Sequence, residues 1–240
     1  MQPTLSIFIP TFNESEIIGE TLERVSAFLN DRSRIQSQAE IIVCDNGSTD
    51  STPEQLLELA KRFPNLRVLL LPERGAGRAF VEGVRRATGD WIVTLDADLS
   101  SGLEFLSYVE QLSSFADAVI GTKTFGRQRR TLFRVLGSQT YILITQYLFD
   151  LGISDFSLGS KAFRRVELLP FLEKLDHWTG HIFEIILAFT LRGKRVLQIG
   201  VNCEDTRTSR FNILHEAFYR FRHLARMYKI ASAPNSWLRP

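Results

Sequence analysis

Two aspartates, Asp96 and Asp98, stand two residues apart directly after an apolar run that ends at Leu95. Alternate residues of an extended chain point to the same side, so the two carboxylates can approach one cation. A hard divalent ion such as Mg²⁺ or Mn²⁺ takes carboxylate oxygens together with substrate phosphate oxygens. Such an ion neutralises charge on a departing diphosphate. The pattern indicates a catalytic metal–diphosphate site at Asp96 and Asp98, with a plain polar loop as the alternative.

Two more polar clusters follow earlier apolar runs of the chain. Pro10 stops the first run and sets a rigid turn, and the residues after it, among them Phe12 and Glu14, can hold a nucleoside. Asn13 could instead cap a helix at this turn. Asp45 follows the second run in a glycine-containing turn and can bind a base or a ribose, unless it belongs only to the turn.

Two arginines, Arg74 and Arg78, flank two glycines at the predicted start of a helix. Free N–H groups and the helix dipole attract anions at such a place, so we expect it to bind the diphosphate. A solvated turn before the helix is the alternative. The spacing differs from Gly-x-Gly-x-x-Gly because Phe80 occupies the third glycine position, which disfavours a dinucleotide dehydrogenase.

The elements that must position these residues alternate between strand and helix. Apolar runs predict strands over residues 5–9, 40–44, 66–71 and 91–95, with helical spacing between them. This order predicts an α/β fold, with a mostly parallel Rossmann-like sheet and helices on both faces. The polar clusters then gather at the carboxyl ends of the strands, where such sheets bind ligands. In the less regular second half, strands are predicted over 118–121 and 195–199, a loop leading into a strand over 155–163, and helices over 181–191 and 211–230.

Together these motifs resemble glycosyltransferase family two, in particular its dolichol-phosphate mannose synthase-like branch. The matching segments are residues 10–14, 45–50, 74–79 and 89–100, and the likeness spans roughly residues 5–212. The resemblance implies a GT-A fold, a divalent metal, and inversion at the anomeric carbon of a nucleotide-sugar donor such as GDP-mannose or UDP-glucose. It assigns the nucleoside to Pro10, Phe12, Glu14 and Asp45.

The resemblance also makes Asp98 the direct metal ligand, and Asp96 either shares the metal or faces the ribose. Ser100 stands where many mannose synthases carry a glutamine, and Phe12 stands where tyrosine is commoner. These departures leave the donor base and sugar open. We expect a catalytic domain over residues 1–210, with a nucleotide-sugar half to about 120 and an acceptor half after it. An amphipathic C-terminal helix and tail would occupy 211–240.

A polyprenyl (dolichyl-type) phosphate acceptor is implied by the same branch, and the second half supplies cations for its phosphate. The candidates are Lys123, Arg127, Arg134, Arg207 and Arg210. Residues 132–149 and 211–230 are amphipathic and could lie on a membrane surface, where Arg220, Arg222, Arg226 and Lys229 would meet anionic headgroups. Helices packed on the core would show the same pattern.

A phosphate acceptor changes the chemistry that is needed. Its second pKa is about 6, so it is largely dianionic at neutral pH and needs little help from a general base. Catalysis would then rest on positioning and charge stabilisation. If the acceptor is a sugar hydroxyl instead, Glu204 and Asp205 are candidates for the base. His181 is expected to be a wall of the acceptor site or a core residue, with Glu184 one helical turn beyond it.

Composition sets the outer limits. The net charge of +2 is too near neutral to indicate nucleic acid. Cys44 and Cys203 lie far apart and are expected to be buried thiols. With no signal-peptide pattern, we expect a peripheral protein on the cytoplasmic face of a membrane, with room for a membrane-anchored partner. Three functions remain open: a polyprenyl-phosphate glycosyltransferase, a transferase to a sugar hydroxyl, and a catalytically silent nucleotide-sugar-binding subunit.

Overall fold

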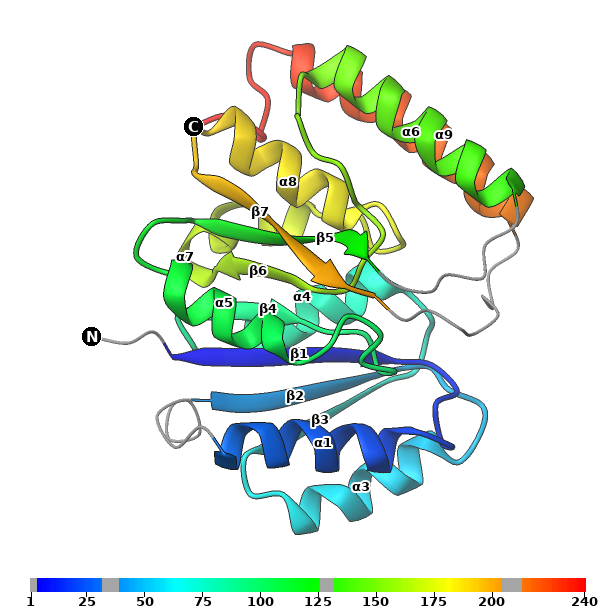
Figure 1. Cartoon of the computed structure of the whole chain (residues 1–240). Coiled ribbons are helices and arrows are strands. Elements are labelled where there is room, and N and C mark those ends of the chain that lie inside the picture. The colour runs from blue at the N-terminus through cyan, green and yellow to red at the C-terminus, as the bar shows by residue number, and fades with distance from the viewer. Residues whose placement is uncertain (1–3, 32–38, 126–131, 204–212) are drawn as a thin grey trace.

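A computed structural model of the chain describes residues 4–31, 39–125, 132–203 and 213–240. Within these residues the centre is a seven-stranded sheet in the order β3-β2-β1-β4-β6-β5-β7, shown in Figure 1. The strands are β1 (Leu5–Thr11), β2 (Ala39–Asn46), β3 (Leu66–Leu71), β4 (Trp91–Thr94), β5 (Ala118–Phe125), β6 (Lys161–Arg164) and β7 (Val196–Asn202). Strand β6 alone runs antiparallel to its neighbours β4 and β5, and the other described pairs are parallel. The prediction of a mostly parallel sheet is confirmed.

Helices cover both faces of this sheet. They are α1 (Ile18–Asp31), α3 (Thr52–Arg62), α4 (Ala76–Arg86), α5 (Glu104–Leu112), α6 (Leu132–Phe149), α7 (Arg165–Leu168), the 3₁₀ helix η1 (Leu169–Lys174), α8 (His181–Leu191) and α9 (Ile213–Ser232). Helix α5 was not predicted. The expected boundary at residue 210 between catalytic domain and C-terminal helix lies outside the described residues.

Side chains of the central strands alternate between two apolar cores. Phe8 of β1 and Ile42 of β2 pack with α4, α8 and α9 on one face. Ile7 and Ile9 pack with α1, α3 and α5 on the other. Because both faces are covered, these strands read as continuous apolar runs in the sequence.

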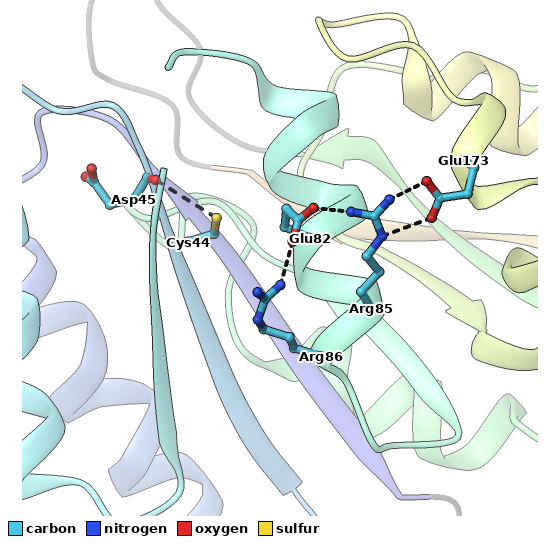
Figure 2. Close-up of polar contacts among 6 residues, drawn as sticks. All are labelled: Cys44, Asp45, Glu82, Arg85, Arg86 and Glu173. Atoms are coloured by element: carbon cyan, nitrogen blue, oxygen red, sulfur yellow. Dashed lines mark hydrogen bonds and ion pairs between the residues drawn. The ribbon is translucent and has the colours of Figure 1, made fainter. Parts of the chain in front are cut away.

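Helix α4 carries charged side chains on its outer surface and is tied by them to η1. Figure 2 shows Arg85 donating two hydrogen bonds to the Glu173 carboxylate, while Glu82 pairs with Arg85 and Arg86. These exposed pairs contribute little to stability individually. Below them, burial raises the pKa of the Cys44 thiol to about 12. Cys44 and Cys203 are both buried and form no disulfide, as predicted.

Helices α6 and α9 lie side by side at the end of the molecule beyond α8 (Figure 1). Tyr141 of α6 joins them through edge contacts with Phe183 of α8 and Phe221 of α9, at centroid distances of 6.2 and 6.3 Å. Among the described residues, no helix combines the length and the apolar character that crossing a bilayer requires. Both helices expose large apolar side chains, including Leu143, Tyr147, Phe218 and Tyr228.

Replacing Phe163 tests the core that supports β4 and β6. Its ring is fully buried and makes edge contacts with Phe80 and Phe189. We expect Phe163→Ala to lower the free energy of unfolding by about 3–5 kcal/mol, because a large cavity would remain. Phe115, which is 66% exposed, is the matched control. Phe115→Ala should change the free energy of unfolding, measured in urea, by less than about 0.5 kcal/mol. Equal losses in both variants would contradict this account of the core.

Candidate functional site

A cavity of about 810 Å³ opens at the carboxyl ends of β1 and β4. Strand β1 lies between β2 and β4. The connection after β1 leads to β2 on one side, and the later connection from β3 leads to β4 on the other side. Open α/β sheets bind ligands at the point where the connections change direction in this way. Seven predicted site residues line this one space: Pro10, Phe12, Glu14, Arg74, Asp96, Asp98 and Lys123. Their meeting confirms the expectation that polar strand ends gather at one edge of the sheet.

Asp96 is half-buried and is positioned by the segment before β6. Its Oδ2 accepts a hydrogen bond from the Gly159 backbone N–H at 2.9 Å, and the Thr94 hydroxyl holds the Gly159 carbonyl. A side chain at position 159 would collide with the Asp96 carboxylate. Gly159 is therefore part of the site, and sequence reasoning missed it because nothing local links residues 96 and 159.

Asp98 is oriented by its own turn. Its Oδ1 accepts a hydrogen bond from the Ser100 N–H at 3.0 Å. Leu99 between them has a φ of 51°, in the left-handed region that residues other than glycine seldom adopt. This turn brings Ser100 to the cavity beside Asp98.

The donor set suits a hard cation only in part. Within the described residues, no three His, Cys, Asp or Glu side chains form a group that could hold a metal ion. Two half-buried carboxylates on one cavity wall fit Mg²⁺ or Mn²⁺ if diphosphate oxygens and water complete the coordination. The metal therefore stays a prediction that depends on the substrate.

The opposite wall is aromatic and cationic. The guanidinium carbon of Arg74 lies 4.1 Å from the ring centroid of Phe12 and 5.7 Å from that of Trp178. Glu14, also on the cavity, has its backbone N–H bonded to the Thr52 hydroxyl at 2.9 Å. The loop after β1 is thus fixed to the start of α3.

Asp45 lies near the cavity but does not line it. It is 2% exposed, and its Oδ2 accepts a hydrogen bond from the Ser48 N–H at 3.1 Å. Its Oδ1 has no hydrogen-bond partner among the described residues. The neighbouring Asn46 reaches the cavity instead, and sequence reasoning did not single it out. Nucleoside binding by Asp45 stays a prediction.

The start of α4 differs from the expected anion site. The N–H of Gly75 is bonded to Asn46 Oδ1 at 2.6 Å, and those of Gly77 and Arg78 to the carbonyls of Trp178 and His177 at 2.7 and 3.1 Å. These three donors are therefore not available to a diphosphate, and diphosphate binding at this helix start stays a prediction that would rest on the side chains. Arg78 forms an ion pair with Glu73 and does not line the cavity, whereas Arg74 does.

The two glycines of this helix start, Gly75 and Gly77, leave room for a close approach of another segment. A Cβ at Gly77 would collide with the Asp176 carbonyl, and one at Gly75 would lie 2.7 Å from the His177 carbonyl oxygen. They let the segment 176–178 approach α4 closely enough to accept its N–H groups.

That segment is held in turn by α8 and α9. The Asp176 carboxylate accepts hydrogen bonds from the N–H groups of Trp178 and Gly180, both at 2.9 Å. The Asp176 N–H donates to one oxygen of the buried Glu184 carboxylate at 2.6 Å, and His223 of α9 pairs with the other at 2.8 Å. Glu184 therefore holds the loop in place, and it does not line the cavity as His181 does.

His181 forms part of the cavity wall, as predicted. Its Nδ1 lies 3.1 Å from the Trp178 carbonyl oxygen, and its ring is tilted against Phe80 at 5.4 Å. Burial lowers the pKa of His181 to about 4, so the imidazole is neutral near pH 7. Lys161 is completely buried behind the cavity, where burial lowers its pKa to about 8.

The predicted acceptor cations are only partly described. Lys123 lines the cavity, with its Nζ 3.4 Å from the Ser157 hydroxyl. Arg127, Arg207 and Arg210, like Glu204 and Asp205, lie outside the described residues, as does the side chain of Arg134. The structure adds Thr179 and Arg220 to the cavity wall. The helical pattern of residues 211–230 gave no sign that Arg220 would reach the strand ends.

Comparison with known proteins identifies a family that matches most of this chain. The family described as Glycosyl transferase family 2 matches residues 6–218. An undecaprenyl-phosphate 4-deoxy-4-formamido-L-arabinose transferase of Pectobacterium atrosepticum is 32% identical over 163 residues, 67% of this chain and 49% of the relative. The transferase of the same name from Serratia proteamaculans is 27% identical over 213 residues, 88% of this chain and 59% of the relative. The chain thus spans about half the length of the curated relatives it matches.

Solved structures are similar in fold. A mannosyltransferase from Pyrobaculum calidifontis, in complex with GDP-Man and Mn²⁺, has a TM-score of 0.66 at 23% identity and covers 99% of this chain and 67% of its own. Glucosyl-3-phosphoglycerate synthase from Mycobacterium tuberculosis, in complex with UDP, has a TM-score of 0.70 at 20% identity, with coverages of 95% and 80%. The expected GT-A fold is confirmed by these similarities.

A methyl group at position 77 tests the contact between α4 and the segment 176–178. We expect Gly77→Ala to lower the free energy of unfolding by more than about 1 kcal/mol, because its Cβ would meet the Asp176 carbonyl. Gly19 of α1 is the matched control, since a Cβ there has no neighbour within 4 Å. Gly19→Ala should be neutral or stabilising by up to about 1 kcal/mol. Thermal and urea unfolding measure both, and a Gly77→Ala variant as stable as the native chain would refute the close contact.

The neutral His181 predicts an acid-dependent loss of stability. Its pKa is lower in the folded chain than the ordinary value of 6.5, so its contribution is complete above pH 6.5 and is lost as the pH falls toward 4. Between pH 7.5 and 4.5 we expect the native chain to lose on the order of 2 kcal/mol more than His181→Gln. Urea unfolding of both proteins at both pH values measures the difference. The same loss in both would show that His181 does not titrate as described.

Proposed function

The chain belongs to glycosyl transferase family 2, and from that premise we propose that it transfers a sugar from a nucleotide diphosphate sugar to a polyprenyl phosphate. The observation that carries the proposal is the cavity at the carboxyl ends of β1 and β4, which Asp96 and Asp98 share with Pro10, Phe12 and Glu14. The names of the curated relatives, which act on undecaprenyl phosphate, support the class of acceptor.

The donor would lie across the ends of β1 and β4. Pro10, Phe12 and Glu14 form the wall for the nucleoside, with Asp45 behind it and Arg74 stacked on Phe12. The diphosphate would then extend toward Asp96 and Asp98. Mg²⁺ or Mn²⁺ held there by both carboxylates would supply charge neutralisation of the leaving diphosphate. Mn²⁺ accompanies the nucleotide sugar in similar structures, which supports a divalent ion here.

The acceptor phosphate would enter from the side of Lys123. One of its oxygens attacks the anomeric carbon and forms the new C–O bond, while the bond to the diphosphate breaks and the nucleoside diphosphate leaves with the electron pair. Attack opposite to the leaving group inverts the anomeric carbon. Because the attacking phosphate is already largely ionised, the step needs positioning and charge stabilisation more than a base. The neutral His181 would shape the wall without adding charge.

We further propose a hexose donor, GDP-mannose or UDP-glucose, and a dolichyl-type acceptor on the cytoplasmic face of a membrane. The similar structures that contain GDP-Man or UDP-glucose support either base. The exposed apolar residues of α6 and α9, next to exposed Arg222, Arg226 and Lys229, support contact with an anionic membrane surface. A membrane-anchored partner subunit would place the chain there more firmly.

Transfer to a hydroxyl group is the second candidate. It is favoured by the similarity to glucosyl-3-phosphoglycerate synthase, which has been solved with phosphoglyceric acid. A catalytically silent binding subunit is a third, and the intact Asp96 and Asp98 count against it.

A panel of nucleotide sugars, with Mn²⁺ or Mg²⁺ and a short polyprenyl phosphate, tests the proposal. We expect a lipid-linked sugar that disappears when EDTA removes the metal. Asp98→Asn should lower kcat by about a hundredfold or more, because a ligand of the diphosphate-bound cation is lost. Glu58→Gln is the matched control, since Glu58 is exposed on α3 and pairs with Lys61. A water-soluble glycoside would favour the hydroxyl acceptor, and the absence of both product and metal-dependent nucleotide binding would favour the silent subunit.

A further inference from the structure

Helix α9 contributes an arginine to the central cavity. Arg220 lines the same space as Asp96 and Lys123, and its side chain is 35% exposed. The sequence had placed this residue among the cations that face membrane headgroups. The correction has a simple geometric cause, because residues two apart on a helix point to nearly opposite sides. Phe218, which is 65% exposed, takes the outer side, so Arg220 takes the inner one.

The Arg220 guanidinium is contacted by Glu216 on its own helix and by Tyr141 of α6. Its Nε donates to Glu216 at 2.8 Å, and Glu216 also accepts a hydrogen bond from the Thr179 hydroxyl at 2.6 Å. Its guanidinium carbon lies 5.9 Å from the ring centroid of Tyr141 on α6. Within the described part of the chain, the two terminal Nη nitrogens donate no hydrogen bond. The side chain is therefore held in place while its fork of donors remains available.

The surroundings of this fork suit an anion. Lys123 adds a second cation to the cavity, and His181, neutral through burial, adds no competing charge. The positive charge of Arg220 also reaches the buried Lys161, where it adds to the effect of burial in lowering the pKa of Lys161. Glu216 offsets part of the Arg220 charge, but it engages only the Nε edge.

We propose that Arg220 binds the phosphate group of the acceptor through its two Nη nitrogens. A planar guanidinium matches two oxygens of one phosphate, which a lysine cannot do. The acceptor is favoured over the donor diphosphate because the donor wall is built from the ends of β1 and β4 and from Arg74. Arg220 instead comes from a helix whose outer face exposes Phe218 and lies along the apolar α6. A ligand with a phosphate head and an apolar tail matches that arrangement. This inference rests on the proposed function.

Steady-state kinetics of the full chain with two variants test the assignment. We expect Arg220→Gln to raise the KM for a short polyprenyl phosphate by about ten- to a hundredfold, because a charge-assisted pair of hydrogen bonds is lost. The KM for the nucleotide sugar should stay within about twofold. Arg220→Lys keeps the charge and can still pair with Glu216, so it should fold normally and raise the acceptor KM by a smaller factor. Arg62→Gln is the control, since Arg62 is exposed on α3, outside the cavity lining and away from α6 and α9.

The outcomes separate this inference from the proposed function. If the native chain makes no lipid-linked sugar, the proposed function fails. If it does and Arg220→Lys or Arg220→Gln keeps the native acceptor KM, only the role of Arg220 is overturned. A rise in the donor KM alone would assign Arg220 to the diphosphate and also overturn the inference. If Arg220→Gln does not fold, the result with Arg220→Lys decides, because a native acceptor KM there excludes a forked phosphate contact.

Discussion

The shape of the cavity depends on the backbone hydrogen bonds from the start of α4 to the carbonyls of His177 and Trp178. The first N–H groups of any helix lack partners within the helix, and burying them without partners is costly. Here the segment before α8 supplies acceptors, and Gly75 and Gly77 leave room for its approach. The hydrogen bonds that the helix backbone requires thereby hold one wall of the site in place. Trp178 belongs to this wall, and its ring lies 5.7 Å from the guanidinium carbon of Arg74.

The same contact connects distant parts of the fold. The carboxylate of Glu184 holds the Asp176 N–H with one oxygen and His223 of α9 with the other. Glu184 is 1% exposed and His223 5%, so removing either partner would leave a polar group buried without compensation. Helix α9 is therefore attached to the wall of the cavity by buried polar bonds as well as by apolar packing. An element at the far end of the molecule takes part in defining the site.

The negative and positive side chains of the cavity come from different elements of the fold. The turn after β4 supplies Asp96 and Asp98, each oriented by a backbone N–H. Cations come from other segments, Arg74 before α4, Lys123 on β5 and Arg220 on α9. In the proposed reaction, a diphosphate and a phosphate monoester both carry several negative charges, so bringing them together requires compensating charge from several directions. One short motif could not supply that arrangement.

Local patterns determined the alternation of strands and helices from β1 to β4, the mostly parallel sheet and the residues at the ends of β1 and β4. Those features follow from apolar periodicity and from where each run stops, which neighbouring residues encode. Only the tertiary structure decided what the glycines at the start of α4 do, that Gly159 supports Asp96, that Asn46 reaches the cavity in place of Asp45, and that Arg220 turns inward. Each of these depends on contacts between residues far apart in the chain. The spacing of residues along a sequence indicates which residues share a helix or strand. It does not indicate which other helix or strand packs against them.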